Sequence, residues 1–237
     1  MKLALFICII LFSNYSRAFT SEKNTITFCY ETWEPFAYVN SHGESEGEHI
    51  AFLKKAVSSI GYQASFSELP FLRCLSHVKA GDIDFMLHID ESSNISFIDF
   101  PIGNWDLVLA SKANNQGDAG NNDEKHYNVI ISQSFSYPQP VIDKLNKTFR
   151  HIIKKSYYIG IKNDIKRLFK LIESGFVDAM LIDKIWAEHE LEKGDFNLVL
   201  SEQLFYSQPQ YIGYGKTRHE LAEQLRQALI SVSSVQN

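Results

Sequence analysis

Apolar and polar positions in the first half of the chain follow two alternating periods, which predict strands and helices in turn. A β-rich run covers Thr25 to Tyr30, and His49 to Ile60 places its apolar residues on one helical face before a glycine. Strict alternation from Tyr62 to Ser67 predicts a second strand, a proline opens a helix over Phe71 to Ala80, and Ile83 to Leu87 is typical of a buried strand. This order predicts an α/β fold with a mostly parallel sheet.

A second series of the same kind follows a surface loop at residues 113–125, which is rich in Asn, Gly, Asp and Glu. Residues 127–132 predict a strand, Asn163 caps an amphipathic helix, and Val177 to Ile182 is again an apolar strand. The second half therefore repeats the order of elements of the first.

One short pattern recurs in both halves, as AGDIDFML at 80–87 and SGFVDAML at 174–181. A turn chemistry common to many proteins also produces such a match, but within two similar series it supports two lobes of related topology. A last amphipathic helix, opened by a capping box, is expected to return to the first lobe. We therefore predict lobe 1 at 19–106 plus 207–237 and lobe 2 at 107–206, joined by a two-strand hinge.

The first 18 residues have the features of a secretory signal peptide. A lysine precedes the apolar run Leu3 to Phe12, and the small residues Ser16 and Ala18 stand where a signal peptidase reads. A buried N-terminal helix is the alternative, and it leaves the lysine and the small residues unexplained. We expect cleavage after Ala18, a soluble mature protein and a periplasmic location, because no later segment approaches the roughly 20 apolar residues that cross a bilayer.

Charge and cysteine content narrow the possible partners. The formal net charge of −5 and the pI near 5.9 argue against a nucleic-acid partner, because phosphate binding needs concentrated Lys and Arg. Cys8 falls in the leader, so the mature chain keeps only Cys29 and Cys74. An even pair in an oxidising compartment favours a disulfide over two buried thiols.

Motifs for catalysis are lacking in the sequence. There is no GxSxG, HExxH, P-loop or GxGxxG motif, and no Cys and His spacing that suggests zinc. We therefore expect no enzyme activity, no cofactor and no metal. Most histidines are expected at the surface or satisfied in the core, but His88 ends a predicted buried strand where a cleft opens, so it is retained as a candidate binding residue.

An aromatic segment, WEPFAYV at 33–39, directly follows the first strand. Open α/β sheets bind their ligands at the carboxyl ends of strands, so Trp33, Phe36 and Tyr38 are candidates for the wall of a cleft. The alternative is packing into the core, which we expect for Phe36.

Four polar residues complete the candidate site. Arg73 lies near a helix start, where its guanidinium reaches a ligand carboxylate or points into solvent. Ser134 and Tyr137 follow a strand of the second lobe, in a segment that either suits an anion or polar ligand or is an ordinary polar loop. Asp183 ends another strand, where it either accepts hydrogen bonds from a ligand amine or serves only as a helix N-cap.

Over nearly the whole mature length the chain resembles the bacterial extracellular solute-binding proteins of family 3, which include amino-acid receptors of ABC importers. The resemblance rests on five short motifs in the expected order: Trp33 with Pro35 and Phe36, Leu69-Pro70-Phe71-Leu72-Arg73-Cys74, Gly81 to Asp84, Asp99-Phe100-Pro101, and Tyr211 with Gly213, Tyr214 and Lys216.

The resemblance implies a type II periplasmic binding protein-like fold and a role for Asp183 in holding a ligand amino group. It also exposes a departure. In amino-acid receptors of this family, an Arg six residues before the phenylalanine of the Asp-Phe-Pro motif binds the ligand carboxylate. This chain has Asn94 at that position. Either Arg73 takes over the ligand carboxylate, or the ligand is not a standard amino acid.

The function expected from these features is capture of a small polar solute between two lobes, for an ABC permease or a membrane sensor, by a monomer. One alternative is an enzyme on the same fold, such as a cyclohexadienyl or arogenate-type dehydratase. The other is a receptor-like protein that acts only through protein contacts.

Overall fold

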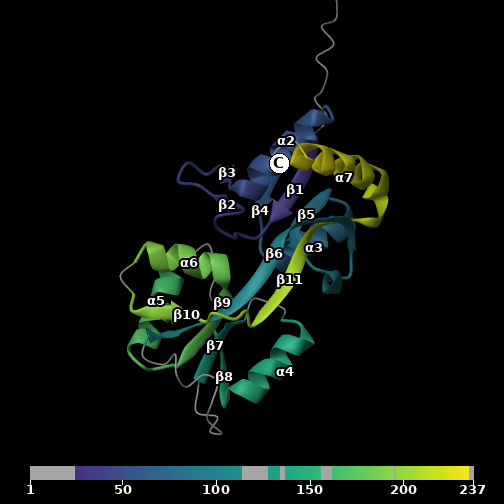
Figure 1. Ribbon diagram of the computed structural model, residues 1–237. Coiled ribbons are helices and arrows are strands. Elements are labelled where there is room, and N and C mark those ends of the chain that lie inside the picture. Colours follow the sequence, from purple (N-terminus) through teal and green to yellow (C-terminus); the bar gives the residue numbers. More distant parts are fainter. Residues whose placement is uncertain (1–24, 114–127, 134–136, 156–161, 195, 235–237) are drawn as a thin grey trace, which may run out of the picture.

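The computed structural model describes most of the chain (Figure 1), in residues 25–113, 128–133, 137–155, 162–194 and 196–234. The predicted signal peptide at 1–18 and the candidate Ser134 lie outside these residues. None of the helices in these residues has the length and apolarity that a membrane span requires. The elements are β1 (Thr25–Tyr30), β2 (Tyr38–Val39), β3 (Ser45–Glu46), α2 (Glu48–Ser59), β4 (Gln63–Glu68), α3 (Phe71–Ala80), β5 (Phe85–Ile89), the 3₁₀ turn η1 (Glu91–Ser93), β6 (Ser96–Lys112), β7 (Asn128–Ser132), α4 (Gln139–Thr148), β8 (His151–Lys155), α5 (Lys162–Glu173), β9 (Ala179–Asp183), α6 (Lys184–Glu192), β10 (Leu198–Leu200), β11 (Tyr206–Tyr214), the 3₁₀ turn η3 (Lys216–Arg218) and α7 (His219–Ser234).

The main sheet runs in the order β4-β1-β5-β11-β6-β9-β7-β8, with β10 also paired to β6. β1 pairs in parallel with β4 and β5, and β7 pairs in parallel with β8 and β9. The four pairings that involve β6 or β11 are all antiparallel. The sheet is therefore mixed rather than mostly parallel, because the two long central strands run against their neighbours.

Buried apolar residues form separate cores at the two ends of the sheet. Strands β1 and β5 with helices α2 and α7 bury one set, whose largest members include Phe28 and Phe85. Strands β7 and β9 with helices α5 and α6 bury another around Phe169. The long strand β6 contributes Ile98 to the first core and Val108 to the second, so it physically connects them (Figure 1).

The repeated sequence pattern corresponds to the same local structure in both halves. Gly81 follows α3 with φ 86°, and Gly175 follows α5 with φ 74°, a left-handed conformation that glycine adopts without steric cost. Asp84 accepts a hydrogen bond from the backbone N–H of Thr27 in β1 at 2.8 Å, and Asp178 accepts one from the first residue of β7 at 2.7 Å. Each aspartate thus ties the turn before one strand to the start of its neighbour, and the predicted helix, turn and strand are confirmed in both places.

Cys29 and Cys74 form the expected disulfide, with their Cα atoms 5.7 Å apart. Both are fully buried, in a small apolar cluster between β1 and α3. The bridge fixes the first turns of α3 beside the carboxyl end of β1. The aromatic segment at 33–39 follows that end of the strand.

Candidate functional site

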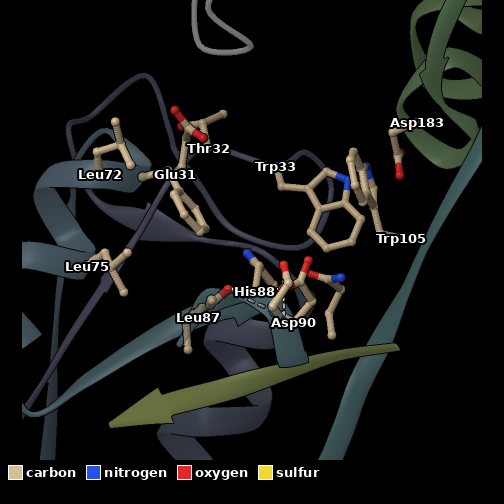
Figure 2. A pocket seen from close by; sticks show the side chains of 14 residues that line it. Glu31, Thr32, Trp33, Leu72, Leu75, Leu87, His88, Asp90, Trp105 and Asp183 are labelled. Atoms are coloured by element: carbon tan, nitrogen blue, oxygen red, sulfur yellow. Dashed lines mark hydrogen bonds between the residues drawn. The ribbon is translucent and has the colours of Figure 1, made fainter. Parts of the chain in front are cut away.

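A cleft of about 250 Å³ opens beside the central strands (Figure 2). Its wall combines the loop after β1, helix α3, the end of β5 with η1, the middle of β6 and β11, and the end of β9. The lining residues are Glu31, Thr32, Trp33, Phe71, Leu72, Leu75, Leu87, His88, Asp90, Ser92, Ser93, Trp105, Asp183 and Gln210.

Trp33 forms the central aromatic wall of this cleft. A tight turn holds it, in which the backbone of Trp33 pairs with that of Ala37. Its ring packs edge-on against Phe36 at 4.9 Å and against His88 at 4.8 Å between centroids. The side chain is only 7% exposed, and its indole Nε1 has no hydrogen-bond partner among the described residues. Trp33 therefore brings an apolar surface and an unused donor to the cleft.

Two histidines, His49 and His88, contact each other and pack against the Trp33 ring. His49 Nδ1 and His88 Nε2 lie 2.9 Å apart, and His49 also bonds the backbone carbonyl of Ile102. A neutral His49 that serves this carbonyl carries its proton on Nε2, and in this tautomer His88 Nε2–H donates to His49 Nδ1. His88 Nδ1 is then a bare acceptor, and it has no partner within the described residues.

Both histidines are kept neutral by their surroundings. Burial lowers the pKa of His49 to about 4, partly opposed by the bond to Ile102. Burial, and then the neighbouring His49, hold the pKa of His88 well below 6.5. His88 also has a φ of 60°, an uncommon conformation for a residue other than glycine.

Asp183 brings the end of β9 into the site. One carboxylate oxygen accepts from the backbone N–H of Trp186 at 2.9 Å, so Asp183 is the N-cap of α6 as well as a lining residue. Burial raises the pKa of Asp183 to about 6, opposed in part by the Trp186 N–H and by the Trp33 indole, which faces the carboxylate without completing a hydrogen bond. The carboxylate thus stands buried without a cation to compensate it.

Two further carboxylates line the cleft, Glu31 in the loop after β1 and Asp90 before η1. Burial raises the pKa of Glu31, although the backbone N–H of Phe71 at the start of α3 partly offsets this. Asp90 caps η1, and its Oδ1 accepts from the backbone N–H of Ser92 at 2.8 Å and from the Ser92 hydroxyl at 2.6 Å. No lysine or arginine is among the residues that line the described cleft.

Three of the residues singled out from the sequence meet at this cleft: Trp33, His88 and Asp183. Tyr137 does not line it, but its ring stacks on that of Trp105 at 5.7 Å and its hydroxyl accepts from the backbone N–H of Ser132 at 3.1 Å. Tyr137 therefore supports the cleft wall from behind.

Three other candidates lie away from the cleft wall. Phe36 is partly buried and stacks on His49 at 4.6 Å, so it packs beneath Trp33. Tyr38 lies in β2, and Arg73 is exposed on α3. In place of Arg73, the neighbouring apolar Phe71 and Leu72 line the cleft.

Trp105 and Gln210, on the two central strands, were not predicted from the sequence. These residues line the cleft because β6 and β11 pair side by side, with Gln208 opposite Trp105. A tryptophan inside a long strand carries no local signal of a binding site. Only the pairing of two segments far apart in the chain brings it there.

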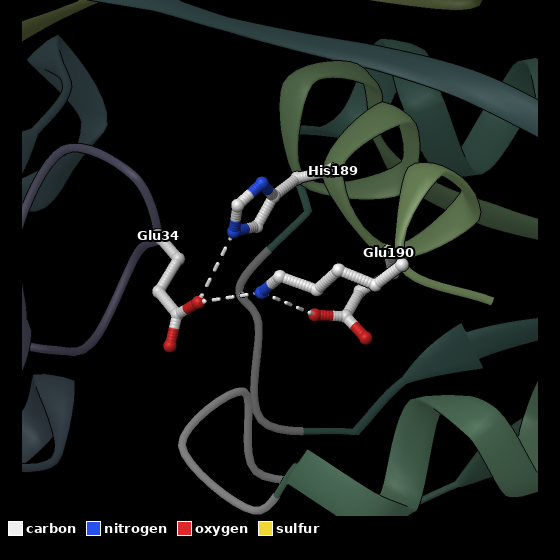
Figure 3. Close-up of polar contacts among 4 residues, drawn as sticks. Glu34, His189 and Glu190 are labelled. Carbon is white, nitrogen blue, oxygen red and sulfur yellow. Dashed lines mark hydrogen bonds and ion pairs between the residues drawn. The ribbon is translucent and has the colours of Figure 1, made fainter. Parts of the chain in front are cut away.

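Near the cleft a polar cluster joins the loop after β1 to helix α6 (Figure 3). Glu34 lies 3.4 Å from His189 Nε2 and 3.2 Å from Lys193 Nζ, and Lys193 is also 3.4 Å from Glu190. The Lys193 ammonium is therefore already shared between two carboxylates. This cluster is a direct contact between elements of the two cores.

No family model and no curated protein matches the chain at the sequence level. Solved structures match it over most of its length. The probable amino-acid ABC transporter extracellular-binding protein ytmK from Bacillus subtilis is 17% identical, with 89% of this chain and 92% of that chain covered and a TM-score of 0.74. An ancestral arginine-binding protein bound to arginine is 20% identical, with 89% and 93% covered and a TM-score of 0.68.

A third match is the ancestral amino acid-binding protein AncCDT-1, a precursor of cyclohexadienyl dehydratase. It is 15% identical, with 89% of this chain and 90% of that chain covered and a TM-score of 0.67. At such identities the likeness establishes the architecture. The chain has the α/β fold of type II periplasmic binding proteins, as predicted.

Proposed function

We propose that the mature chain is a periplasmic solute-binding protein of the family 3 type, which captures a small polar solute between two lobes and delivers it to an ABC permease or a membrane sensor. The observation that carries the proposal is the cleft itself. Its lining comes from elements of both cores and from the two strands that connect them. The solved neighbours that are amino-acid-binding or arginine-binding proteins add support at the level of the fold.

The proposed lobes are residues 19–106 with 207–237, and residues 107–206. Two chain crossings join them, where Asp106 of β6 pairs with Ser207 of β11. The Ser207 hydroxyl donates to the Asp106 carboxylate at 2.5 Å. A bend at these crossings opens and closes the cleft without breaking either core, and such a mechanism needs no covalent chemistry.

A thermal-shift screen of the mature protein against amino acids, polyamines, small carboxylates and peptides tests this proposal. A ligand that binds only the folded state raises the melting temperature, by an amount that grows with its concentration above Kd. Small-angle scattering with the same ligand is expected to show a smaller radius of gyration. If no compound in the panel raises the melting temperature, the solute-binding function is wrong.

A second candidate is an enzyme on the same fold. The observation that favours it is Asp183, whose buried carboxyl has its pKa raised to about 6 inside the cleft, the range of a general acid. One solved neighbour, AncCDT-1, is also a dehydratase precursor. Conversion of a prephenate-like substrate by the wild type, lost in Asp183→Asn, establishes the enzyme; no turnover eliminates it.

Glu34→Gln is expected to weaken ligand binding although Glu34 does not line the cleft. The substitution removes the contacts of Glu34 with Lys193 and His189. These contacts join the loop after β1 to α6, so their loss makes the closed form of the protein less favourable. Because the pair is partly exposed, the expected effect is about 1 kcal/mol, or about fivefold in Kd. Isothermal titration calorimetry with the best ligand of the screen measures it.

Glu44→Gln is the matched control, since Glu44 is exposed in the same lobe and its replacement removes the same charge. Its Kd is expected to stay at the wild-type value. Equal affinities for both variants and the wild type contradict a role of the Glu34 cluster in closure.

A further inference from the structure

The cleft wall contains acidic side chains and no lysine or arginine among the described residues. Its acidic residues are Glu31, Asp90 and Asp183. A zwitterionic amino acid brings a carboxylate that must find a cation or several donors in a site shielded from water. Asn94 stands where amino-acid receptors of the family carry an Arg for the ligand carboxylate, and it is exposed.

Several lysines and arginines lie close to this wall in the chain, but they lie outside its lining. Lys184 directly follows Asp183 and lies 3.9 Å from Glu188. Arg73 is exposed on α3 outside the lining, whereas its neighbours Phe71 and Leu72 face the cleft. Lys193 is held between Glu34 and Glu190. A ligand carboxylate in the cleft therefore meets like charges without a compensating cation.

The aromatic lining independently points to a ligand. The Trp33 side chain is only 7% exposed, so its ring is largely shielded from water. Figure 2 shows its indole nitrogen on the side of the ring toward Asp183, and Trp105 lines the same end of the cleft. Indole faces bind organic cations through their quadrupole, and more strongly where water is excluded. Two indoles and a buried carboxylate form such a surface.

We propose that the solute is a small organic cation without a carboxylate group, a protonated amine or diamine held by Asp183 and Asp90 against the Trp33 and Trp105 indoles. This inference rests on the proposed solute-binding function and specifies its substrate class.

The geometry leaves acceptor capacity for such a ligand. The bond that Asp183 receives from the Trp186 N–H occupies Oδ1, and the bonds that Asp90 receives from η1 also converge on Oδ1. These bonds leave the second oxygen of each carboxylate unused, and it can accept from an ammonium group. His88 Nδ1 is a further acceptor without a partner among the described residues.

Matched pairs of compounds that differ only in the α-carboxylate test the substrate class. Cadaverine with lysine, putrescine with ornithine, and agmatine with arginine are titrated into the mature protein at pH 8 by calorimetry. At least one amine is expected to bind about tenfold or more tightly than its parent amino acid, because the carboxylate is repelled by the acidic wall. Binding of the amine is expected to weaken as the pH falls from 8 to 5, where Asp183 takes up a proton.

Asp183→Asn tests the named contact while keeping an N-cap oxygen for α6. It is expected to weaken amine binding about tenfold or more, and Asp90→Asn is expected to weaken it as well. Glu192→Gln is the control, since Glu192 is an exposed carboxylate on the same helix outside the cleft. It is expected to leave the Kd within about twofold. Circular dichroism and a melting curve establish that each variant is folded.

The outcomes separate the two proposals. Tighter binding of an amine, lost in Asp183→Asn, supports the cationic ligand. Equal or tighter binding of the parent amino acids, or stabilisation only by a compound outside the amine series, overturns the cationic ligand and leaves the solute-binding function standing. If no compound of the full panel binds, both proposals fail.

Discussion

Replacement of both Cys29 and Cys74 by alanine is expected to lower the free energy of unfolding by about 4 kcal/mol. The bridge closes a loop with a sequence separation of 45 residues, and the chain-entropy relation gives about 4 kcal/mol for a loop of this length. Both sites are buried in an apolar cluster, where alanine is tolerated as a small apolar residue. Loss of the link to β1 is also expected to loosen the start of α3, which lines the cleft.

Urea unfolding of the oxidised wild type and the double variant measures this effect. The wild type unfolded with a thiol reductant present is the matched control, because it removes the bridge without changing the sequence. It is expected to lose a similar free energy. A double variant as stable as the oxidised wild type contradicts a stabilising role of the disulfide.

Acidification from pH 7 to pH 4.5 is expected to destabilise Asp183→Asn more than the wild type. The pKa of His49 is about 4 in the folded protein against 6.5 for the free group, so its contribution to stability is present above pH 6.5 and is lost as the pH falls toward 4. This loss is about 3 kcal/mol when complete, and His88 acts in the same direction.

Asp183 acts in the opposite direction in the wild type. Its pKa is raised from 3.8 to about 6, so the folded state binds a proton that the unfolded state does not, and stability from this group rises as the pH falls from 6 toward 4. The gain reaches about 2 kcal/mol near pH 4.5. The variant lacks this gain, so its acid loss is expected to exceed that of the wild type by about 2 kcal/mol.

Urea unfolding of both proteins at pH 7, 5.5 and 4.5 measures the difference. His88→Asn provides a second comparison, because asparagine tolerates the left-handed φ of this position and does not titrate. It is expected to lose less stability on acidification than the wild type does. Parallel pH curves for the wild type and Asp183→Asn contradict the opposing titrations.

Much of the fold could be predicted from local patterns. The helix over Phe71 to Ala80 begins after Pro70 and ends at Gly81 with a left-handed φ, as the sequence indicates. The repeated Gly and Asp of the two halves have the same roles in space. Each of these features depends on neighbours within a few residues, or on a turn that only certain residues allow.

The direction of the central strands could not be predicted in this way. β6 and β11 pair antiparallel with their neighbours, although the alternation of elements predicts a mostly parallel sheet. The direction of a strand depends on the end of the sheet at which the preceding connection brings the chain back. Apolar periodicity is the same for both directions, so the sequence pattern does not contain that information.

Local sequence likewise identifies some residues of the candidate site and not others. Trp33, His88 and Asp183 stand at the ends of predicted strands, and that position alone identifies them as candidates. Arg73 is a candidate for its charge at a helix start, but Phe71 and Leu72 of the first turn of α3 line the cleft, whereas Arg73 is exposed outside it. A rotation of about 100° per residue along a helix decides this, and local sequence does not fix which face meets the ligand.

Local sequence is enough to predict the alternation of elements, the turn residues that end the helices, the cysteine pair and the aromatic segment after β1, since these depend on short-range sterics and composition. The tertiary structure decided the mixed sheet, the entry of Trp105 and Gln210 into the cleft, and the acidic character of its wall. These depend on pairing between β6 and β11 and on the apposition of β9 to the loop after β1. Only folding brings together the carboxylates of Glu31, Asp90 and Asp183, because no short segment of the chain contains all three.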